Sequence, residues 1–162
     1  MTTIRLKAID GFECPAYVAQ PKGKPKGAVV VIQEIFGVNP HIREVVDGYA
    51  AAGYFAIAPA MFHRAKHGVE LGYTADDMQA GMALKAAIEA LPDMAFMADV
   101  QAAVKYAHQT SGAKVGIVGY CWGGLLTWRA AALVQGLSAA VPYYGGGTTT
   151  EQEIARHPNC PV

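Results

Sequence analysis

The spacing of hydrophobic residues changes several times along the chain and predicts strands and helices in alternation. Residues 4–9 and 12–20 are strand-like, and Asp10-Gly11 between them is a strong signal for a two-residue hairpin turn. Short apolar runs further along predict strands buried on both faces, as in a parallel sheet. These runs lie at residues 28–32, 54–58, 114–118 and 139–143.

Helical periodicity fills the stretches between these strands, at residues 41–52, 74–90, 94–109 and about 122–135. Gly53 suits the end of the first helix, and Thr74 suits the start of the second. A hairpin followed by β-α-β-α-α-β-α-β predicts an α/β fold with an open, mostly parallel sheet flanked by helices. No repeat or linker divides the chain, so residues 1–162 are expected to form a single domain.

The end of the chain is expected to leave this sheet incomplete. Residues 145–158 are loop-like with one short helical turn, and Pro161-Val162 then resembles the first step of another strand. A sheet of this kind that stops on entering a strand is expected to continue at its C-terminus. The alternative is a small self-contained domain whose last residues fray.

Composition narrows the class of protein. The chain is 52% hydrophobic and 16% charged, which is typical of a globular domain. Thirteen basic and thirteen acidic residues balance, so charge gives no reason to expect nucleic acid or membrane as a partner. Three cysteines without metal-ligand spacing indicate a reducing compartment. Without a signal peptide or an apolar run of about 20 residues, we expect a cytoplasmic protein.

The most informative motif is Gly119-Tyr120-Cys121-Trp122-Gly123, between a predicted strand and a predicted helix. G-x-[Ser/Cys]-x-G in that position is a nucleophile elbow, whose tight turn needs small residues two positions either side. The Cys121 side chain should then stand at the carboxyl end of the sheet, facing the unpaired amides of the helix. Such amides lower the pKa of a thiol and can hold an oxyanion. The alternative is an inert buried thiol in a Gly-rich turn.

A second motif, residues 33–37, directly follows the strand at 28–32. That strand should neighbour the elbow strand, and the loop after it completes the oxyanion hole in such folds. Burying a carboxylate costs several kcal/mol unless it is paired, so Glu34 is expected to have a partner. The thiol of Cys121 and a nearby base are candidates. The alternative is a solvent-facing glutamate at a strand end.

The segments QEIFGVN, AAGYFAIAP and GYCWGG, in this order and spacing, resemble the dienelactone hydrolase (carboxymethylenebutenolidase) family over nearly the whole chain. The resemblance implies an α/β-hydrolase fold with Cys121 as nucleophile. It also implies that Glu34 contacts the resting cysteine and helps to generate the thiolate. The backbone amides of Ile35 and Trp122 correspond to the oxyanion hole.

Three further residues are expected to line the substrate pocket: Phe36, Tyr120 and His63. His63 follows the strand at 54–58 and so could lie at the pocket mouth. We expect no cofactor and no metal, because His63 and His67 lack a nearby carboxylate or cysteine as a further ligand.

The chain departs from the family pattern in two places. The family triad is Cys, Asp, His, and its Asp and His correspond to positions beyond residue 162, so this chain alone is expected to be nearly inactive. In residues 70–97, where family members acting on dienelactone carry a substrate-binding arginine, Lys85 is the only cation. We therefore expect a different small ester or lactone as substrate.

Three functional hypotheses follow. The first is a hydrolase that forms an acyl-enzyme on Cys121, with a histidine after residue 162 as general base. The second is a non-catalytic or inactive truncated hydrolase scaffold, which thiol reactivity would distinguish. The third, a redox or flavin-type domain, would need a CxxC pair or a phosphate-binding glycine loop, and the sequence has neither. The natural substrate and the oligomeric state do not follow from the sequence.

Overall fold

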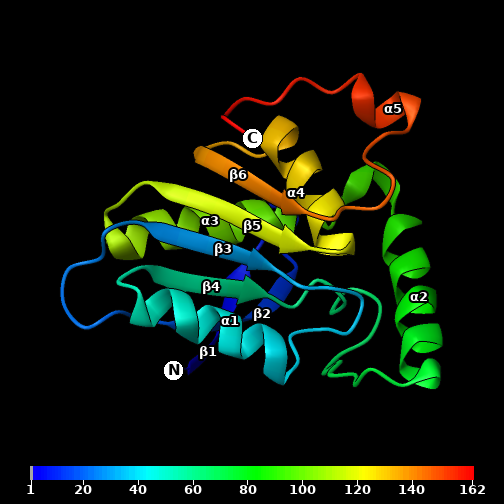
Figure 1. Cartoon of the computed structure of the whole chain (residues 1–162), viewed down its shortest axis with the longest axis horizontal. Coiled ribbons are helices and arrows are strands. Elements are labelled where there is room, and N and C mark those ends of the chain that lie inside the picture. Colours follow the sequence, from blue (N-terminus) through cyan, green and yellow to red (C-terminus); the bar gives the residue numbers. More distant parts are fainter. Residues whose placement is uncertain (1) are drawn as a thin grey trace.

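The sheet is the organising element of the fold in the computed structural model, which describes residues 2–162. Its six strands lie in the order β1-β2-β4-β3-β5-β6 (Figure 1). Strands β3 to β6 are mutually parallel, whereas β2 is antiparallel to both β1 and β4. The strands are β1 Thr2–Lys7, β2 Glu13–Ala19, β3 Ala28–Ile32, β4 Phe55–Pro59, β5 Val115–Tyr120 and β6 Leu137–Tyr143. The predicted mostly parallel sheet with an N-terminal hairpin is thus confirmed.

The hairpin between β1 and β2 differs from the prediction in its loop. Ala8 N–H donates to Phe12 O, so three residues, 9–11, form the connection instead of two. Gly11 has φ +85°, the left-handed conformation that ends three-residue hairpin loops of this kind. Ile9 is therefore part of the loop and fully exposed rather than the last residue of a strand.

Helices cover both faces of the sheet. Helix α1 packs on one face, and α3 and α4 pack on the other, while α2 stands across the carboxyl ends of the strands (Figure 1). Successive side chains of β3 point to opposite faces of the sheet, so Ile32 faces α3 and α4 while Val31 faces α1. The helices are α1 Pro40–Ala51, α2 Ala75–Glu89, α3 Met97–Ser111, α4 Trp122–Leu133 and the short α5 Glu151–Ile154, with a 3-10 turn η1 at Pro92–Met94.

Side-chain caps hold the starts of α1 and α2. Asn39 Oδ1 accepts from Ile42 N–H at 3.1 Å at the start of α1. Thr74 begins α2 as predicted, and Asp77 completes a reciprocal capping box with it. Such caps satisfy amides that a helix leaves without partners in its first turn, so they define where α1 and α2 begin.

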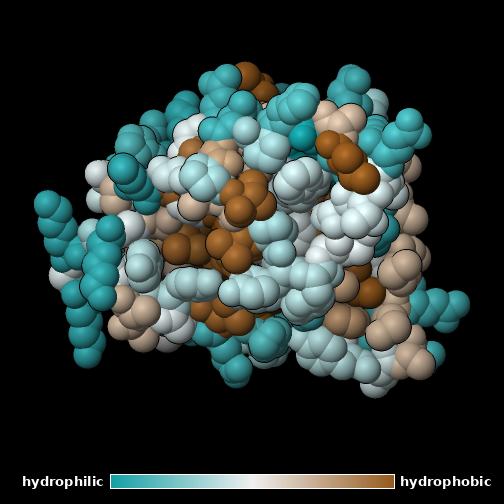
Figure 2. All heavy atoms as spheres, turned by 45° about the horizontal axis from the view of Figure 1, so that its top comes forward, coloured by the Kyte–Doolittle hydropathy of each residue, from teal (hydrophilic) through white to brown (hydrophobic). Residues whose placement is uncertain are grey.

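Strand β6 lies at an edge of the sheet, and its surroundings expose apolar side chains. Val141 and Tyr143 are each nearly half exposed, and Leu133 and Ile154 are also exposed. Figure 2 shows hydrophobic residues gathered on this side of the molecule. The tail returns beside this edge, where Pro161 O accepts from Ala140 N–H at 2.9 Å. This hydrogen bond lies where the sequence predicted another strand to begin, and that strand stays a prediction.

None of the helices within residues 2–162 is long and apolar enough to cross a membrane.

Candidate active site

The turn between β5 and α4 has the backbone geometry predicted for an elbow. Cys121 adopts φ +56° and ψ −120°, a conformation that L-residues rarely adopt and that costs about 1–3 kcal/mol. A Cβ on Gly119 would overlap the carbonyl oxygen of Gly123, and one on Gly123 would overlap the carbonyls of Ile32 and Gln33. The two glycines therefore permit a turn that no larger residue would allow.

The last residue of β6 packs against the same turn. Cys121 N–H donates to Tyr143 O at 3.1 Å, and a Cβ on Gly124 would overlap that same carbonyl. These contacts hold Cys121 in its strained conformation, while its side chain is only partly buried. The side chain is therefore not enclosed in the interior, and the role of Cys121 as nucleophile stays a prediction.

Two backbone amides beside the elbow have no protein acceptor. Across the described chain, neither Ile35 N–H nor Trp122 N–H donates a hydrogen bond, although both residues are buried. Trp122 is the first residue of α4, where a helix leaves the amide without an intrahelical partner. Because Gly123 touches the Ile32 and Gln33 carbonyls, the loop carrying Ile35 lies directly against the start of α4. Two free donors therefore come from adjoining segments, as an oxyanion hole requires.

Glu34 has partners, but they are not those that the sequence suggested. Tyr73 Oη donates to Glu34 Oε2 at 3.1 Å, and Tyr144 Oη donates to Oε1 at 3.3 Å. No hydrogen bond joins Glu34 to Cys121 in residues 2–162. The structure therefore shows no hydrogen bond between Glu34 and the thiol, and each carboxylate oxygen accepts one phenol hydroxyl instead.

The electrostatics of Tyr144 link Glu34 to the sulfur. Burial raises the pKa of Tyr144, and the adjacent Glu34 carboxylate and the Cys121 sulfur raise it further. Burial likewise raises the pKa of Tyr73, with Glu34 adding to the shift. Both phenols therefore stay protonated at neutral pH and remain hydrogen-bond donors to the carboxylate.

Neither tyrosine was identified from the sequence as a site residue. Tyr144 directly follows β6, and the carboxyl end of a parallel strand is where ligands bind in such sheets. Its position directly after a parallel strand is the sequence signal that could have identified Tyr144 as a site residue. Tyr73 lies in the loop before α2, and Asn39 Nδ2 donates to its hydroxyl oxygen at 3.3 Å. Only the folded chain brings that loop to Glu34.

The three predicted pocket residues are dispersed. Phe36 is buried and packs edge-on against Tyr73, with ring centroids 4.6 Å apart. Tyr120 stacks on Tyr143 at 5.3 Å and packs on the side of the sheet that α1 covers. His63 stacks on His67 at 3.9 Å and lines a separate cavity that Cys121 does not line. Their pocket roles stay predictions. Phe36 packs against Tyr73 and Tyr120 packs against Tyr144, with centroids 6.4 Å apart, so both contact a partner of Glu34.

Helix α2 anchors the first residue of α4. Trp122 Nε1 donates to Glu89 Oε1 at 3.1 Å, and the Trp122 ring stacks on Phe62 with centroids 5.1 Å apart. Glu89 is also paired with Lys85 at 3.0 Å and with Arg129 at 3.6 Å. This network fixes the orientation of Trp122, whose amide is one of the two free donors.

Gly81 allows α2 to pack closely against the loop that carries the free amide of Ile35. A Cβ on Gly81 would overlap the carbonyl oxygen of Ile35. The helix axis can therefore approach the loop backbone more closely than any side chain would permit. Helix α2 thus contacts both segments that supply the free amides.

A strained cysteine between a parallel strand and a helix, beside the loop that follows the neighbouring strand, defines the α/β-hydrolase class. Comparison with known proteins gives the family. The model of the dienelactone hydrolase family matches residues 14–162, and the chain belongs to that family.

Individual relatives agree with this assignment. A carboxymethylenebutenolidase of Pseudomonas putida is 38% identical over 157 residues, which cover 96% of this chain and 64% of the relative. A Synechocystis relative assigned to the same activity is 36% identical over 150 residues, covering 90% of this chain and 59% of its own length. A Klebsiella pneumoniae crystal structure assigned as a dienelactone hydrolase superposes with a TM-score of 0.69 at 34% identity, covering 90% of this chain and 61% of that one. The chain spans about half to three-fifths of the length of most curated relatives that it matches.

Proposed function

We propose that this chain carries the nucleophile part of a cysteine-dependent hydrolase of small esters or lactones. The observation that carries the proposal is the pair of free amides, Ile35 N–H and Trp122 N–H, beside the strained Cys121. Donors already positioned for a developing oxyanion stabilise a tetrahedral intermediate without reorganising. Family membership supports the same reaction class.

The reaction proceeds through an acyl-enzyme. The Cys121 thiol transfers its proton to a base, and the sulfur adds to the substrate carbonyl carbon to give an oxyanion held by the two amides. Collapse of this intermediate breaks the bond to the leaving oxygen, which takes the proton. Water then adds to the thioester and releases the carboxylic acid and the free thiol.

Glu34 is proposed to assist formation of the thiolate. In the present arrangement Tyr73 and Tyr144 hold both of its oxygens, so the carboxylate is stabilised by two hydroxyl donors. A substrate that displaced either hydroxyl would free one oxygen toward the sulfur. The tyrosines would then act as positioning residues for Glu34.

The general base is proposed to be a histidine, oriented by an aspartate, from a segment after residue 162. No histidine hydrogen-bonds to Cys121 in the part of the chain that the structure describes. The exposed apolar residues around β6, and the bond from Ala140 to Pro161, support a further segment that packs at this edge. Triad members act as a unit, so this chain alone should be slower by several orders of magnitude.

An ester assay tests the proposal. The 162-residue chain should hydrolyse p-nitrophenyl acetate at a rate close to that of its Cys121→Ser variant. A longer chain that contains the predicted Asp and His should show turnover that Cys121→Ser abolishes. Robust Cys121-dependent turnover by the short chain would show that the base lies within it. If the longer chain were inactive, the hydrolase proposal itself would fail.

The second candidate function is an inactive hydrolase-like scaffold, favoured by the absence of a histidine at Cys121 among residues 2–162. Iodoacetamide labelling at neutral pH separates the two. An activated thiol should react faster than glutathione, whereas a scaffold thiol should react no faster.

A further inference from the structure

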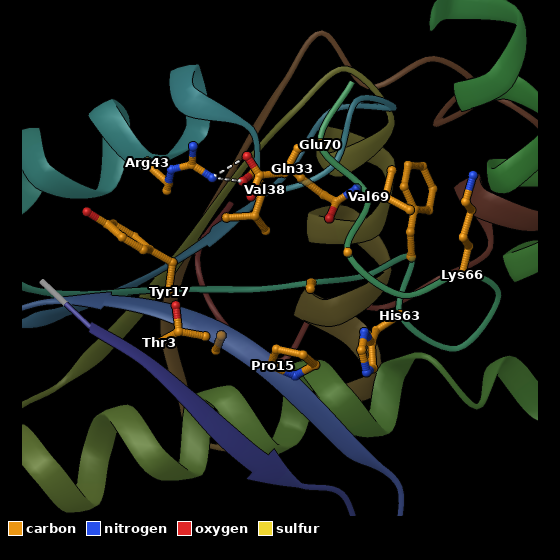
Figure 3. Close-up of a pocket in the computed structure, with 14 residues that line it drawn as sticks. Thr3, Pro15, Tyr17, Gln33, Val38, Arg43, His63, Lys66, Val69 and Glu70 are labelled. Atoms are coloured by element: carbon orange, nitrogen blue, oxygen red, sulfur yellow. Dashed lines mark hydrogen bonds and ion pairs between the residues drawn. The ribbon is translucent and has the colours of Figure 1, made fainter. Parts of the chain in front are cut away.

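A cavity lies near the candidate active site, and two residues that line it adjoin residues of that site. Its volume is about 210 Å³, and it opens between β2, the loop after β3 and residues 60–70 (Figure 3). Gln33 and Phe62 line it. Gln33 precedes Glu34 in the chain, and Phe62 stacks on Trp122. Cys121 is not part of its lining, so this cavity is distinct from the proposed nucleophile site.

The buried polar group in this cavity is the carboxamide of Gln33, a residue only 1% exposed. Its Oε1 accepts from Met61 N–H at 3.0 Å, and its Nε2 donates to Glu34 O at 3.1 Å. An amide nitrogen carries two hydrogens, and the described residues supply an acceptor for one of them. Figure 3 shows the side chain extending among the residues that line the cavity. One hydrogen of this buried amide therefore has no acceptor among the described residues.

The charges around the cavity do not cancel. Arg43 Nη1 is bound to Glu70 at 2.8 Å and to Val38 O at 2.9 Å, so its charge is matched. The exposed side chain of Lys66 also lines the cavity, and within residues 2–162 its ammonium forms no ion pair or hydrogen bond. Burial lowers the pKa of His63, with His67 and Arg5 adding to the shift, so His63 is neutral at pH 7. The lining therefore has one unmatched positive charge, at Lys66.

The remaining lining is largely apolar. The Phe62 ring and the side chains of Val38 and Val69 form its walls, with Pro15 and Ala16 from β2. A volume of about 210 Å³ is below the roughly 300–1,000 Å³ of pockets for drug-sized ligands. The cavity therefore suits a short apolar chain with one anionic end.

We propose that this cavity binds a small monocarboxylate with a short apolar body. The carboxylate lies between the ammonium of Lys66 and the free amide hydrogen of Gln33, and the apolar body packs against Phe62 and Val69. The proposal does not depend on Cys121 being a nucleophile. Because Gln33 and Phe62 adjoin Glu34 and Trp122, an occupied cavity would also restrict the two segments that carry the free amides.

The probe that tests this site is hexanoate, titrated into ¹⁵N-labelled protein and followed by NMR. Saturable shifts should concentrate at the Gln33 side-chain amide, Met61 and Val69. Lys66→Gln should weaken binding by about three- to tenfold, since one charge-assisted contact is lost. Lys114→Gln, at the opposite end of the sheet before β5, is the matched control and should bind normally. Hexanol, which lacks the carboxylate, should bind at least about threefold more weakly.

A cavity-filling variant adds an independent measurement. Val69→Phe places a larger ring in the lining and should abolish the hexanoate shifts while the rest of the spectrum stays folded. Cys121→Ser should bind hexanoate like the unmodified chain, which separates this site from the hydrolase proposal. Non-saturating shifts, shifts centred on the elbow, or equal affinity in Lys66→Gln and the unmodified chain would each overturn the assignment.

Discussion

Tyr144 Oη donates a hydrogen bond to Glu34 Oε1 at 3.3 Å, joining two side chains that are 110 positions apart in the sequence. Tyr73 holds the other carboxylate oxygen at 3.1 Å. Glu34 is therefore clamped by phenols from two separate segments, next to the thiol that it is proposed to assist.

Tyr144→Phe should raise the reactivity of Cys121 at neutral pH by about three- to tenfold. Without this donor one oxygen of Glu34 is free to accept the thiol proton, as proposed for the displaced hydroxyl, so more thiolate forms. The measurement is the pH profile of iodoacetamide labelling, which should move to lower pH. Tyr17→Phe removes a phenol bound to Asp47 elsewhere and serves as the control. In a Glu34→Gln background the effect should disappear, and an unchanged profile would contradict the idea.

Gly123→Ala should destabilise the fold by roughly 1–3 kcal/mol or more, because its Cβ would overlap the carbonyls of Ile32 and Gln33. Gly48→Ala in α1 is a matched control, since nothing lies within 4 Å of its Cβ position. Alanine there should be neutral or stabilising by up to about 1 kcal/mol, from its higher helix propensity. Urea denaturation measures both. Equal stability of the two variants would show that the elbow tolerates a side chain.

Arg64→Met should cost about 3–5 kcal/mol in the free energy of unfolding. Arg64 forms two hydrogen bonds to Asp99, at 2.7 and 2.8 Å, and the Asp99 side chain is only 1% exposed. Removing the arginine leaves a buried carboxylate without its partner. Arg5→Met breaks a mostly exposed pair with Glu13 and should change stability by less than about 1 kcal/mol. A loss of similar size in both variants, measured by thermal or urea unfolding, would argue against the buried pair.

The stabilising contribution of Glu153 to the fold should be lost in acid. Although burial opposes it, hydrogen bonds from Arg156 at 2.6 Å and Arg129 at 2.8 Å hold the pKa of Glu153 below its ordinary 4.5. A carboxyl whose pKa is lower in the folded state stabilises the fold above about pH 4.5, and this contribution is lost as pH falls through the folded-state pKa.

The comparison that isolates this contribution is Glu153→Gln against the unmodified chain. Their difference in unfolding free energy should be largest near pH 7 and should shrink toward pH 3. Glu151→Gln, at an exposed position in the same helix, should show no such trend. A difference between Glu153→Gln and the unmodified chain that stays constant with pH would contradict the prediction.

Cys14 should resist alkylation while the protein is folded. The residue is fully buried in β2, and burial raises the pKa of its thiol to about 12. At pH 8 almost no thiolate is present, so iodoacetamide should label Cys121 first and Cys14 only after denaturation. Peptide mass spectrometry gives the order directly, and early labelling of Cys14 in folded protein would show that β2 opens.

Features set by local spacing were predictable from the sequence. Gly119 and Gly123 flank Cys121 at fixed distances along the chain, so the elbow follows from steric exclusion within five residues. Helix starts such as Thr74 follow from capping within one turn. The hairpin loop was predicted one residue too short, because the pairing of Ala8 with Phe12 depends on how β1 and β2 register across the sheet.

The sequence by itself determined the sheet, the position of the cysteine and the family, since each depends on periodicity or on residues close together in the chain. Tertiary structure alone decided that Tyr73 and Tyr144 hold Glu34, that Glu89 anchors Trp122, and that Lys66 remains unmatched beside a cavity. The hydrogen bonds among these contacts join residues 33 to 110 positions apart. Side chains so distant in sequence meet only where packing of the sheet and helices brings their backbones together, and no local pattern encodes that placement.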